Sequence, residues 1–178
     1  NPLVYDEAVA LIEEHQAAGR DVVIISASGS EVVEPFGQLL GVDHVIATTL
    51  VHENGRYTGE VDFYAYGPNK AVAMERLARE RGYDLSRSYA YSDSETDAPM
   101  LRAVGHPFAV NPDKALRRIA EENDWPILVF RNPVSLRNRL GLDSRVGRAT
   151  AALLIGGAVA AVTASVLRRR KSGRLVAS

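Results

Sequence analysis

Three acidic residues lie within five positions of one another in the stretch YAYSDSETDAPML, residues 89–101. Asp93, Glu95 and Asp97 follow one apolar-leaning run and precede another. Carboxylates in such a place either cap the helix that follows, because negative charge is favoured at a helix N-terminus, or bind a cation. Both interpretations stay open for Asp93 and Asp97 when the stretch is taken alone, whereas Glu95 is expected to be solvated.

Two other polar positions could take part in the same chemistry. Ser26 and Ala27 directly follow DVVII, residues 21–25, and Lys70 follows Gly-Pro-Asn at the expected start of a helix. A hydroxyl and the next backbone N–H can hold phosphate oxygens, and a lysine supplies a compact positive charge against them. Taken singly, Ser26 is more often a loop hydroxyl and Lys70 a solvated lysine. Only their combination with the acidic stretch favours a site for a phosphate group and a metal ion.

The elements that must position these residues alternate between strands and helices. Helical spacing predicts helices from residue 8 to a stop at Gly19 and at residues 31–40, 70–81, 96–104 and 113–122, and apolar runs predict strands at residues 21–25, 44–51, 56–63, 88–92, 107–110 and 127–130. The Asn54-Gly55 turn signal joins two of these strands into a hairpin. The predicted fold class is α/β, with a parallel sheet, helices on both faces and a small β-hairpin insertion. Ligands of such sheets bind beyond the carboxyl ends of the strands.

Composition limits the possible functions. The chain has 178 residues, 46% of them hydrophobic and 24% charged, which is enough for one ordinary domain with an appendage. A formal net charge of −1 gives no overall attraction to nucleic acid, so no nucleic-acid partner is expected. The sequence has no cysteine, which excludes disulfides, thiolate metal sites and a thiol nucleophile within it.

In their order and spacing, these motifs resemble the haloacid dehalogenase superfamily of phosphotransferases, and its phosphoserine-phosphatase-like branch in particular. The resemblance covers about residues 1–130. It rests on IISAS, which places the second family motif at Ser26, on GPNKA, which places the third at Lys70, and on SDSETD, which places the fourth at Asp93 and Asp97. It implies a Rossmannoid parallel sheet and Mg²⁺-dependent hydrolysis of a small phosphomonoester.

The resemblance also implies a role for each matched residue. Ser26, the N–H of Ala27 and Lys70 would bind the substrate phosphate, and Lys70 would also offset charge during catalysis. Asp93 would be the protein ligand of Mg²⁺, an ion that takes only one or two carboxylates and keeps several waters. Asp97 would act in catalysis by orienting a metal-bound water or Lys70.

One part of the family pattern is absent from the sequence. The family's first motif, Asp-x-Asp, supplies the carboxylate that forms an aspartyl-phosphate and a general acid and base, and no Asp-x-Asp occurs in these 178 residues. We therefore expect the C-terminal part of a phosphatase, with the N-terminal strand and the substrate-selecting cap missing, which is inactive by itself. The alternative is a non-catalytic, membrane-anchored module that binds phosphate or a partner.

In this family the strand that carries the first motif is central. Without it, the strands that end at Ser26 and at Ser92 are expected to face each other across an empty lane of about 10 Å, two strand spacings. Alternatively, they close the lane by pairing residues 22–25 with residues 89–91. In either case the matched residues are expected to converge at one edge of the sheet.

The C-terminal region differs in composition from the partial hydrolase core, residues 1–130. Residues 131–148 are expected to form a basic linker, residues 149–167 one continuous, uncharged helix long enough to span a bilayer, and residues 168–178 a basic tail. The uncharged segment is rich in Ala and has basic residues on both sides, so its insertion signal is marginal and gives no orientation. A surface-docked helix is the alternative. We expect membrane association through residues 149–167 and a cytoplasmic catalytic domain.

Overall fold

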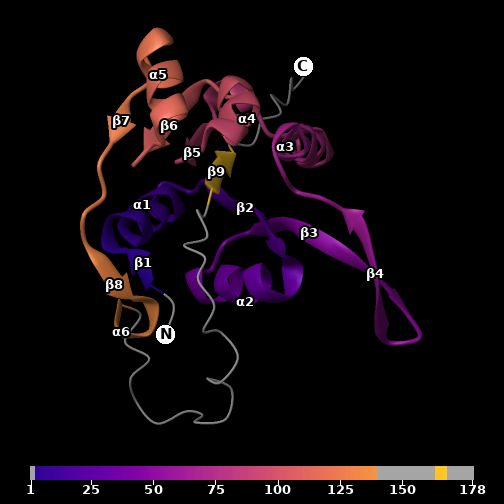
Figure 1. Ribbon diagram of the computed structural model, residues 1–178. Coiled ribbons are helices and arrows are strands. Elements are labelled where there is room, and N and C mark those ends of the chain that lie inside the picture. Colours follow the sequence, from indigo (N-terminus) through magenta and orange to yellow (C-terminus); the bar gives the residue numbers. More distant parts are fainter. Residues whose placement is uncertain (1–2, 140–162, 168–178) are drawn as a thin grey trace, which may run out of the picture.

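The computed structural model describes residues 3–139 and 163–167 (Figure 1). It confirms the α/β class, with a largely parallel sheet. The elements, in chain order, are β1 (Leu3–Tyr5), α1 (Asp6–Ala17), β2 (Asp21–Gly29), α2 (Ser30–Leu40), β3 (His44–Glu53), β4 (Arg56–Phe63), α3 (Pro68–Arg81), the 3₁₀ turn η1 (Leu85–Arg87), β5 (Tyr89–Ser92), the 3₁₀ turn η2 (Glu95–Asp97), α4 (Ala98–Arg102), β6 (His106–Val110), α5 (Lys114–Glu122), β7 (Ile127–Leu128), β8 (Pro133–Ser135), α6 (Leu136–Arg139) and β9 (Thr163–Leu167).

The main sheet has seven strands in the order β4-β3-β2-β9-β5-β6-β7. β2 runs parallel to β3, and β6 runs parallel to both β5 and β7. β9 is antiparallel to its two neighbours, β2 and β5, so these two run in the same direction as each other. The carboxyl ends of β2 and β5 therefore lie at the same edge of the sheet.

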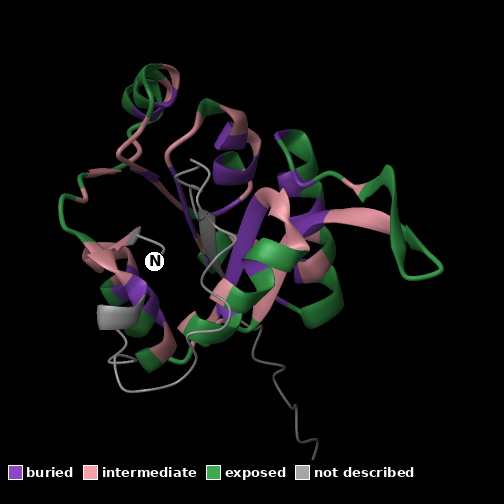
Figure 2. Cartoon of the chain, turned by 60° about the horizontal axis from the view of Figure 1, so that its bottom comes forward, coloured by how far each residue is buried: buried purple, intermediate pink, exposed green. Residues whose placement is uncertain are grey.

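Helices cover both faces of β2, which explains why its apolar run is continuous. Val23 and Ile25 belong to a core that includes residues of α3, α4 and α5. Val22 packs with α1, and Ile24 packs with α2. All four side chains are fully buried, and in Figure 2 the buried residues follow the central strands and the sides of the helices that face them. A strand covered on both faces needs apolar residues at every position.

The predicted hairpin is present as β3 and β4. Asn54 and Gly55 form its turn, with φ angles of 51° and 75°. Positive φ at both central residues is the conformation that a two-residue hairpin turn requires, and Asn-Gly adopts it readily. The hairpin projects away from the helices (Figure 1), and a hydrogen bond from the Tyr57 hydroxyl to Glu31 Oε1, at 3.0 Å, connects it to α2.

Part of the predicted basic linker, residues 131–148, is folded. β8 pairs antiparallel with β1 in a separate two-stranded sheet. The Arg139 guanidinium forms an ion pair with Asp6 and another with Glu13, whose Oε2 lies 2.9 Å from Nη2. These contacts attach β8 to β1 and α6 to α1. The division of the chain at residue 130 stays a prediction.

The expectation of one continuous helix over residues 149–167 is wrong for its last five residues, because Thr163–Leu167 forms β9. Residues 149–162 and the basic tail, residues 168–178, lie outside the described residues. Within the described ranges, no helix has both the length and the apolar character needed to cross a bilayer. The expected membrane association therefore has no support from the described structure.

Both expectations for the lane between β2 and β5 are also wrong, because β9 occupies it. Each residue of β9 pairs with one residue of Asp21–Ile25 in β2, and Tyr89 and Ala90 of β5 pair with its other edge. The physical reason is that buried N–H and C=O groups are costly without partners. An extended segment satisfies both edges at once, whereas a helix in the same place would satisfy neither.

Candidate active site

The acidic loop begins where β5 ends, at Ser92, and the loop that leads into α5 holds it in place. The Asp113 carboxylate accepts hydrogen bonds from the N–H of Glu95 at 2.9 Å and from the N–H of Leu116 at 2.7 Å. The Asp113 N–H donates to the carbonyl of Asp93 at 2.8 Å. Asp113 therefore caps α5 and fixes the backbone of the acidic loop at Asp93 and at Glu95.

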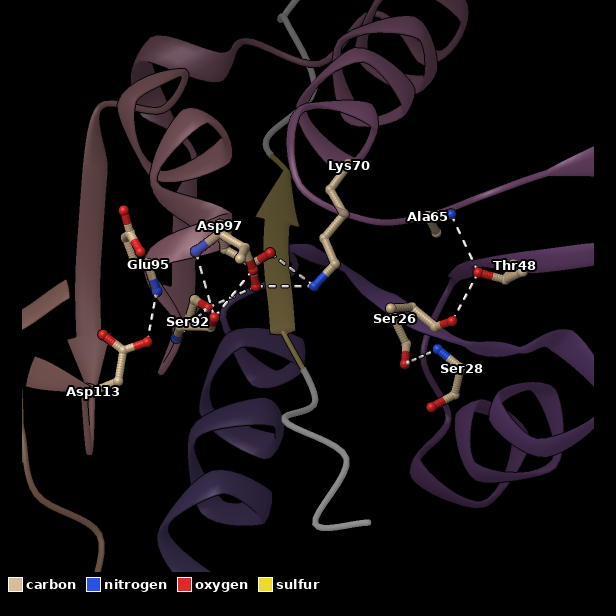
Figure 3. A network of polar contacts seen from close by, with 12 residues as sticks. Ser26, Ser28, Thr48, Ala65, Lys70, Ser92, Glu95, Asp97 and Asp113 are labelled. Carbon is tan, nitrogen blue, oxygen red and sulfur yellow. Dashed lines mark hydrogen bonds and ion pairs between the residues drawn. The ribbon is translucent and has the colours of Figure 1, made fainter. Parts of the chain in front are cut away.

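Lys70 and Asp97 form a buried ion pair at this strand end (Figure 3). Lys70 lies in the first turn of α3, which begins at Pro68, and Asp97 lies at the end of η2. The Nζ atom is 2.9 Å from each of the two carboxylate oxygens. Lys70 is 6% exposed, so it is not a solvated lysine; Asp97 is 1% exposed and its side chain makes no capping hydrogen bond to α4.

Ser92 supports the ion pair by binding Asp97, a role that was not predicted from the sequence. Its hydroxyl donates to Asp97 Oδ2 at 2.7 Å and accepts from the N–H of Ser94 at 3.3 Å. The side chain is 4% exposed. Its position as the last residue of a buried strand, directly before the acidic loop, could have indicated this role.

Asp93 has one carboxylate oxygen, Oδ1, that is buried without a hydrogen-bond partner. Burial raises the pKa of this carboxyl above its ordinary value; the negative charge of Asp97 adds to the rise, and Lys70 opposes it. A buried, partnerless carboxylate oxygen is unfavourable in the ionised form, and a bound cation would relieve this cost. Asp93 therefore fits a role as a ligand of Mg²⁺.

The described residues supply only part of such a metal site. Within them there is no group of three or more His, Asp or Glu side chains placed to hold an ion. Mg²⁺ commonly keeps several waters and takes one or two carboxylates, so a single protein ligand from this loop is compatible with its chemistry.

Ser26 and Ala27 lie at the carboxyl end of β2 (Figure 3). The Ser26 hydroxyl is buried and accepts from the N–H of Ser28 at 3.2 Å. The Ala27 carbonyl accepts from the hydroxyl of Thr48 at 2.7 Å. The loop after β2 is thus folded around its own polar groups, next to the neighbouring strand β3.

The structure brings the four predicted side chains to one edge of the sheet, in two groups. Lys70 and Asp97 are in direct contact, and Asp93 lies in the same loop as Asp97. Ser26 stands at the same edge but on the other side of the lane that β9 occupies (Figure 3). Glu95 is exposed, as expected. An ammonium group, two hydroxyls and a partnerless carboxylate oxygen at one edge can bind an anion and a cation together.

Comparisons with known proteins identify a family profile and relatives that this chain matches. Residues 1–102 match the family profile of haloacid dehalogenase-like hydrolases. A probable phosphatase of Mycobacterium tuberculosis strain H37Rv is 52% identical over 170 residues, covering 94% of this chain and 59% of that protein. A phosphoserine phosphatase of the same strain is 35% identical over 177 residues, covering 94% of this chain and 55% of that protein.

Solved structures agree on the fold. A substrate-bound phosphoserine phosphatase superposes with a TM-score of 0.58 at 24% identity, covering 76% of this chain and 61% of that chain. The chain spans about half the length of the curated relatives it matches, from 46% of one to 59% of another. A profile match over more than half of the 178 residues, together with these relatives, establishes the family: the chain belongs to the haloacid dehalogenase-like hydrolases.

Proposed function

We propose that the complete protein is a Mg²⁺-dependent phosphomonoester hydrolase of the phosphoserine phosphatase type. The observation that carries the proposal is the buried Lys70–Asp97 pair at the strand end that also holds Asp93. Burying two charges is costly and is seldom the most stable use of a core position, so a retained pair at a strand end suggests a functional constraint. The relatives named phosphatase and phosphoserine phosphatase support the same reaction class.

Lys70 would supply a fixed positive charge to the reaction. Its ammonium group offsets the negative charge of a phosphoryl group, and phosphoryl transfer depends mainly on positioning and charge neutralisation. Asp97 and Ser92 hold the Lys70 ammonium group in place, since Asp97 contacts Nζ and Ser92 donates to Asp97. Ser26 and the N–H of Ala27 would bind phosphate oxygens from the other side of the lane.

Asp93 would hold Mg²⁺, and when bound the ion would neutralise phosphate charge and help to orient the substrate. The attacking carboxylate of the proposed aspartyl-phosphate would come from an Asp-x-Asp motif that is not in these 178 residues. In the complete protein its strand would lie between β2 and β5, and it would have to take the place that β9 occupies here. Parallel alignment there would put the motif between Ser26 and Lys70.

The test is a hydrolysis assay of the complete protein with phosphoserine, histidinol phosphate and a generic aryl phosphate, with Mg²⁺ and with excess chelator. Hydrolysis that needs Mg²⁺ and is lost in Asp93→Asn is expected. Phosphoserine as the preferred substrate would support the narrower proposal, and preference for another monoester would overturn that part alone. No Mg²⁺-dependent turnover of any of the three would overturn the whole function.

A further inference from the structure

Thr48 joins two segments that contribute to the candidate site from different directions (Figure 3). It lies in β3 and is 7% exposed. Its Oγ1 donates to the carbonyl of Ala27 at 2.7 Å and accepts from the N–H of Ala65 at 3.2 Å. Ala27 belongs to the end of β2, and Ala65 to the connection between β4 and α3. A single hydroxyl therefore uses its donor and one of its acceptor positions to hold two backbones together.

The first of these bonds fixes a peptide group beside Ser26. The carbonyl of Ala27 and the N–H of Ser28 belong to the same planar unit and point in opposite directions in a trans peptide. Thr48 holds the carbonyl, and the Ser26 hydroxyl oxygen holds the N–H at 3.2 Å. Because Ser26 Oγ accepts this bond, its own proton stays available for donation to a bound oxyanion.

The second bond anchors the segment that leads to Lys70. Ala65 is fully buried, and α3 begins three residues later at Pro68. The N–H of Lys70 donates to the carbonyl of Gly67 at 3.1 Å, so the backbone between Ala65 and Lys70 is short and turned. The position of Ala65 thus limits where the first turn of α3 can place the Lys70 side chain.

We infer that Thr48 is a positioning residue for phosphate binding: its hydroxyl sets the orientation of the Ser26 loop and its distance from the start of α3. The inference rests on the proposed function, because it supposes that Ser26 and Lys70 contact the same phosphate. Thr48 itself does not touch the substrate. Without its hydroxyl, the half-buried Ala27 carbonyl and the buried Ala65 N–H would both lose these hydrogen bonds, and the loop would turn to replace them.

The substitution that isolates the hydroxyl is Thr48→Val, which keeps the shape of the side chain. Thr48→Ser restores the hydroxyl without the methyl group. A matched control is Thr49→Val, the same change at the next residue, whose hydroxyl donates to Asp62 on the exposed hairpin. Each variant is made in the complete protein, and the inhibition constant of inorganic phosphate, KM and kcat are measured with Mg²⁺.

Thr48→Val should raise the inhibition constant of phosphate and KM by about tenfold, the effect of one unsatisfied buried group, while Thr48→Ser stays within about threefold of the wild type. Thr49→Val should change neither. A purely structural role would lower Tm without moving the phosphate constant of the folded enzyme. An unchanged phosphate constant in folded Thr48→Val, or equal losses in the Val and Ser variants, would overturn the inference.

A second measurement separates this inference from the function on which it rests. Amide hydrogen exchange at Ser28 and Ala65, measured by NMR in the ligand-free complete protein, should accelerate at least about tenfold in Thr48→Val, because both amides lose their fixed orientation. Thr48→Ala replaces Thr48→Val if the latter does not fold. Unchanged exchange at both amides would show that the Thr48 hydroxyl does not hold the two backbone segments together. If exchange accelerates in Thr48→Val but the wild-type protein has no phosphatase activity, the two hydrogen bonds of Thr48 are supported. The proposed function and the role of Thr48 in phosphate binding are then both refuted.

Discussion

The Lys70 ammonium lies 2.9 Å from both carboxylate oxygens of Asp97, and the two side chains are almost fully buried. Lys70 lies in the first turn of α3 and Asp97 is the last residue of η2, so the pair joins α3 to the loop after β5. The contact holds the lysine side chain, which is otherwise flexible, in one orientation. It also leaves the pair with no net charge of its own, so the cost of burying either group depends on the presence of the other.

Replacing Lys70 by Met in the complete protein should lower kcat by at least about a hundredfold, the usual loss when one preorganised electrostatic contact is removed. Met keeps the length and the apolar stem of lysine but removes the charge. The free energy of unfolding should fall by about 3 kcal/mol or more, because the Asp97 carboxylate stays buried without its counter-ion. Steady-state kinetics and urea unfolding measure the two effects.

Lys114→Met is the matched control, because Lys114 is exposed at the start of α5 and should tolerate the change. The double variant Lys70→Met, Asp97→Asn should be less destabilised than the sum of the two single variants by about 1–3 kcal/mol. Simple additivity of the two losses would mean that these side chains do not stabilise each other.

Ser92→Ala should lower the free energy of unfolding by about 1–2 kcal/mol, because Asp97 Oδ2 and the N–H of Ser94 both lose a buried partner. It should also lower kcat, since Asp97 is then held less firmly against Lys70. Ser86→Ala is the comparison: Ser86 is exposed, and its hydroxyl bonds only to Asp84 within the same turn. Equal changes in the free energy of unfolding and in kcat for the two variants would show that Ser92 does not support the site.

The 178-residue chain alone should show no phosphatase activity, even with Mg²⁺. No Asp-x-Asp occurs in it, and of the two acids at the strand end Asp97 is engaged with Lys70 while Asp93 is assigned to the metal. The assay uses a generic aryl phosphate, with the complete protein as the positive control. Turnover by the isolated chain that disappears in Asp93→Asn would show that the missing motif has been misjudged.

His15 should make the stability of the fold depend on pH. It is 4% exposed in α1; Nδ1 accepts from the Arg20 guanidinium at 3.2 Å, so Nε2 carries the hydrogen and donates to the Tyr91 hydroxyl at 2.8 Å. Burial and, to a lesser degree, the Arg20 charge lower the pKa of His15 below its ordinary value of 6.5, against a small opposing effect of Glu14. Protonation is therefore easier in the unfolded chain.

The direction of the pH dependence follows from the lower pKa of His15 in the folded state. The stabilising contribution of neutral His15 is present above about pH 6.5 and is lost progressively as the pH falls below it, because the unfolded state then binds more protons. Urea unfolding between pH 7.5 and 5 should show this loss in the complete protein. His15→Gln, which cannot titrate but can still donate to Tyr91, should have a shallower pH dependence. Identical slopes for the two proteins would exclude His15 as the cause.

Elements whose cause is local were predictable from the sequence. The apolar run of residues 21–25 indicated a strand, and Asn54-Gly55 indicated a two-residue turn. Each signal depends on side chains within a few residues of the element itself. The family resemblance gave contact with Lys70 as one of two possible roles of Asp97, and nothing local to either residue specifies the other.

Features that depend on distant partners were not predictable in the same way. Residues 163–167 lack charge and were assigned to a helix, but the open edges of β2 and β5, more than seventy residues away in sequence, make a strand of them. Thr48 and Asp113 look like ordinary strand and capping residues until their hydrogen bonds to Ala27 and Glu95 are seen. Such roles come from tertiary contacts, which residue type and spacing do not specify.

β9 runs opposite to β2 and β5, so it brings its first residue, not its last, to the edge where Ser26 and Asp93 lie: Thr163 pairs with Ile25. Backbone pairing accepts almost any side chain, which is why an exposed strand edge recruits segments so readily. Ligands of a parallel sheet, in contrast, bind beyond the carboxyl ends of its strands, so the proposed reaction needs its attacking carboxylate at that edge. Completing the sheet and completing the reaction are therefore separate requirements in this protein. β9 supplies backbone partners to β2 and to part of β5, but the attacking carboxylate of the proposed reaction would still have to come from another segment.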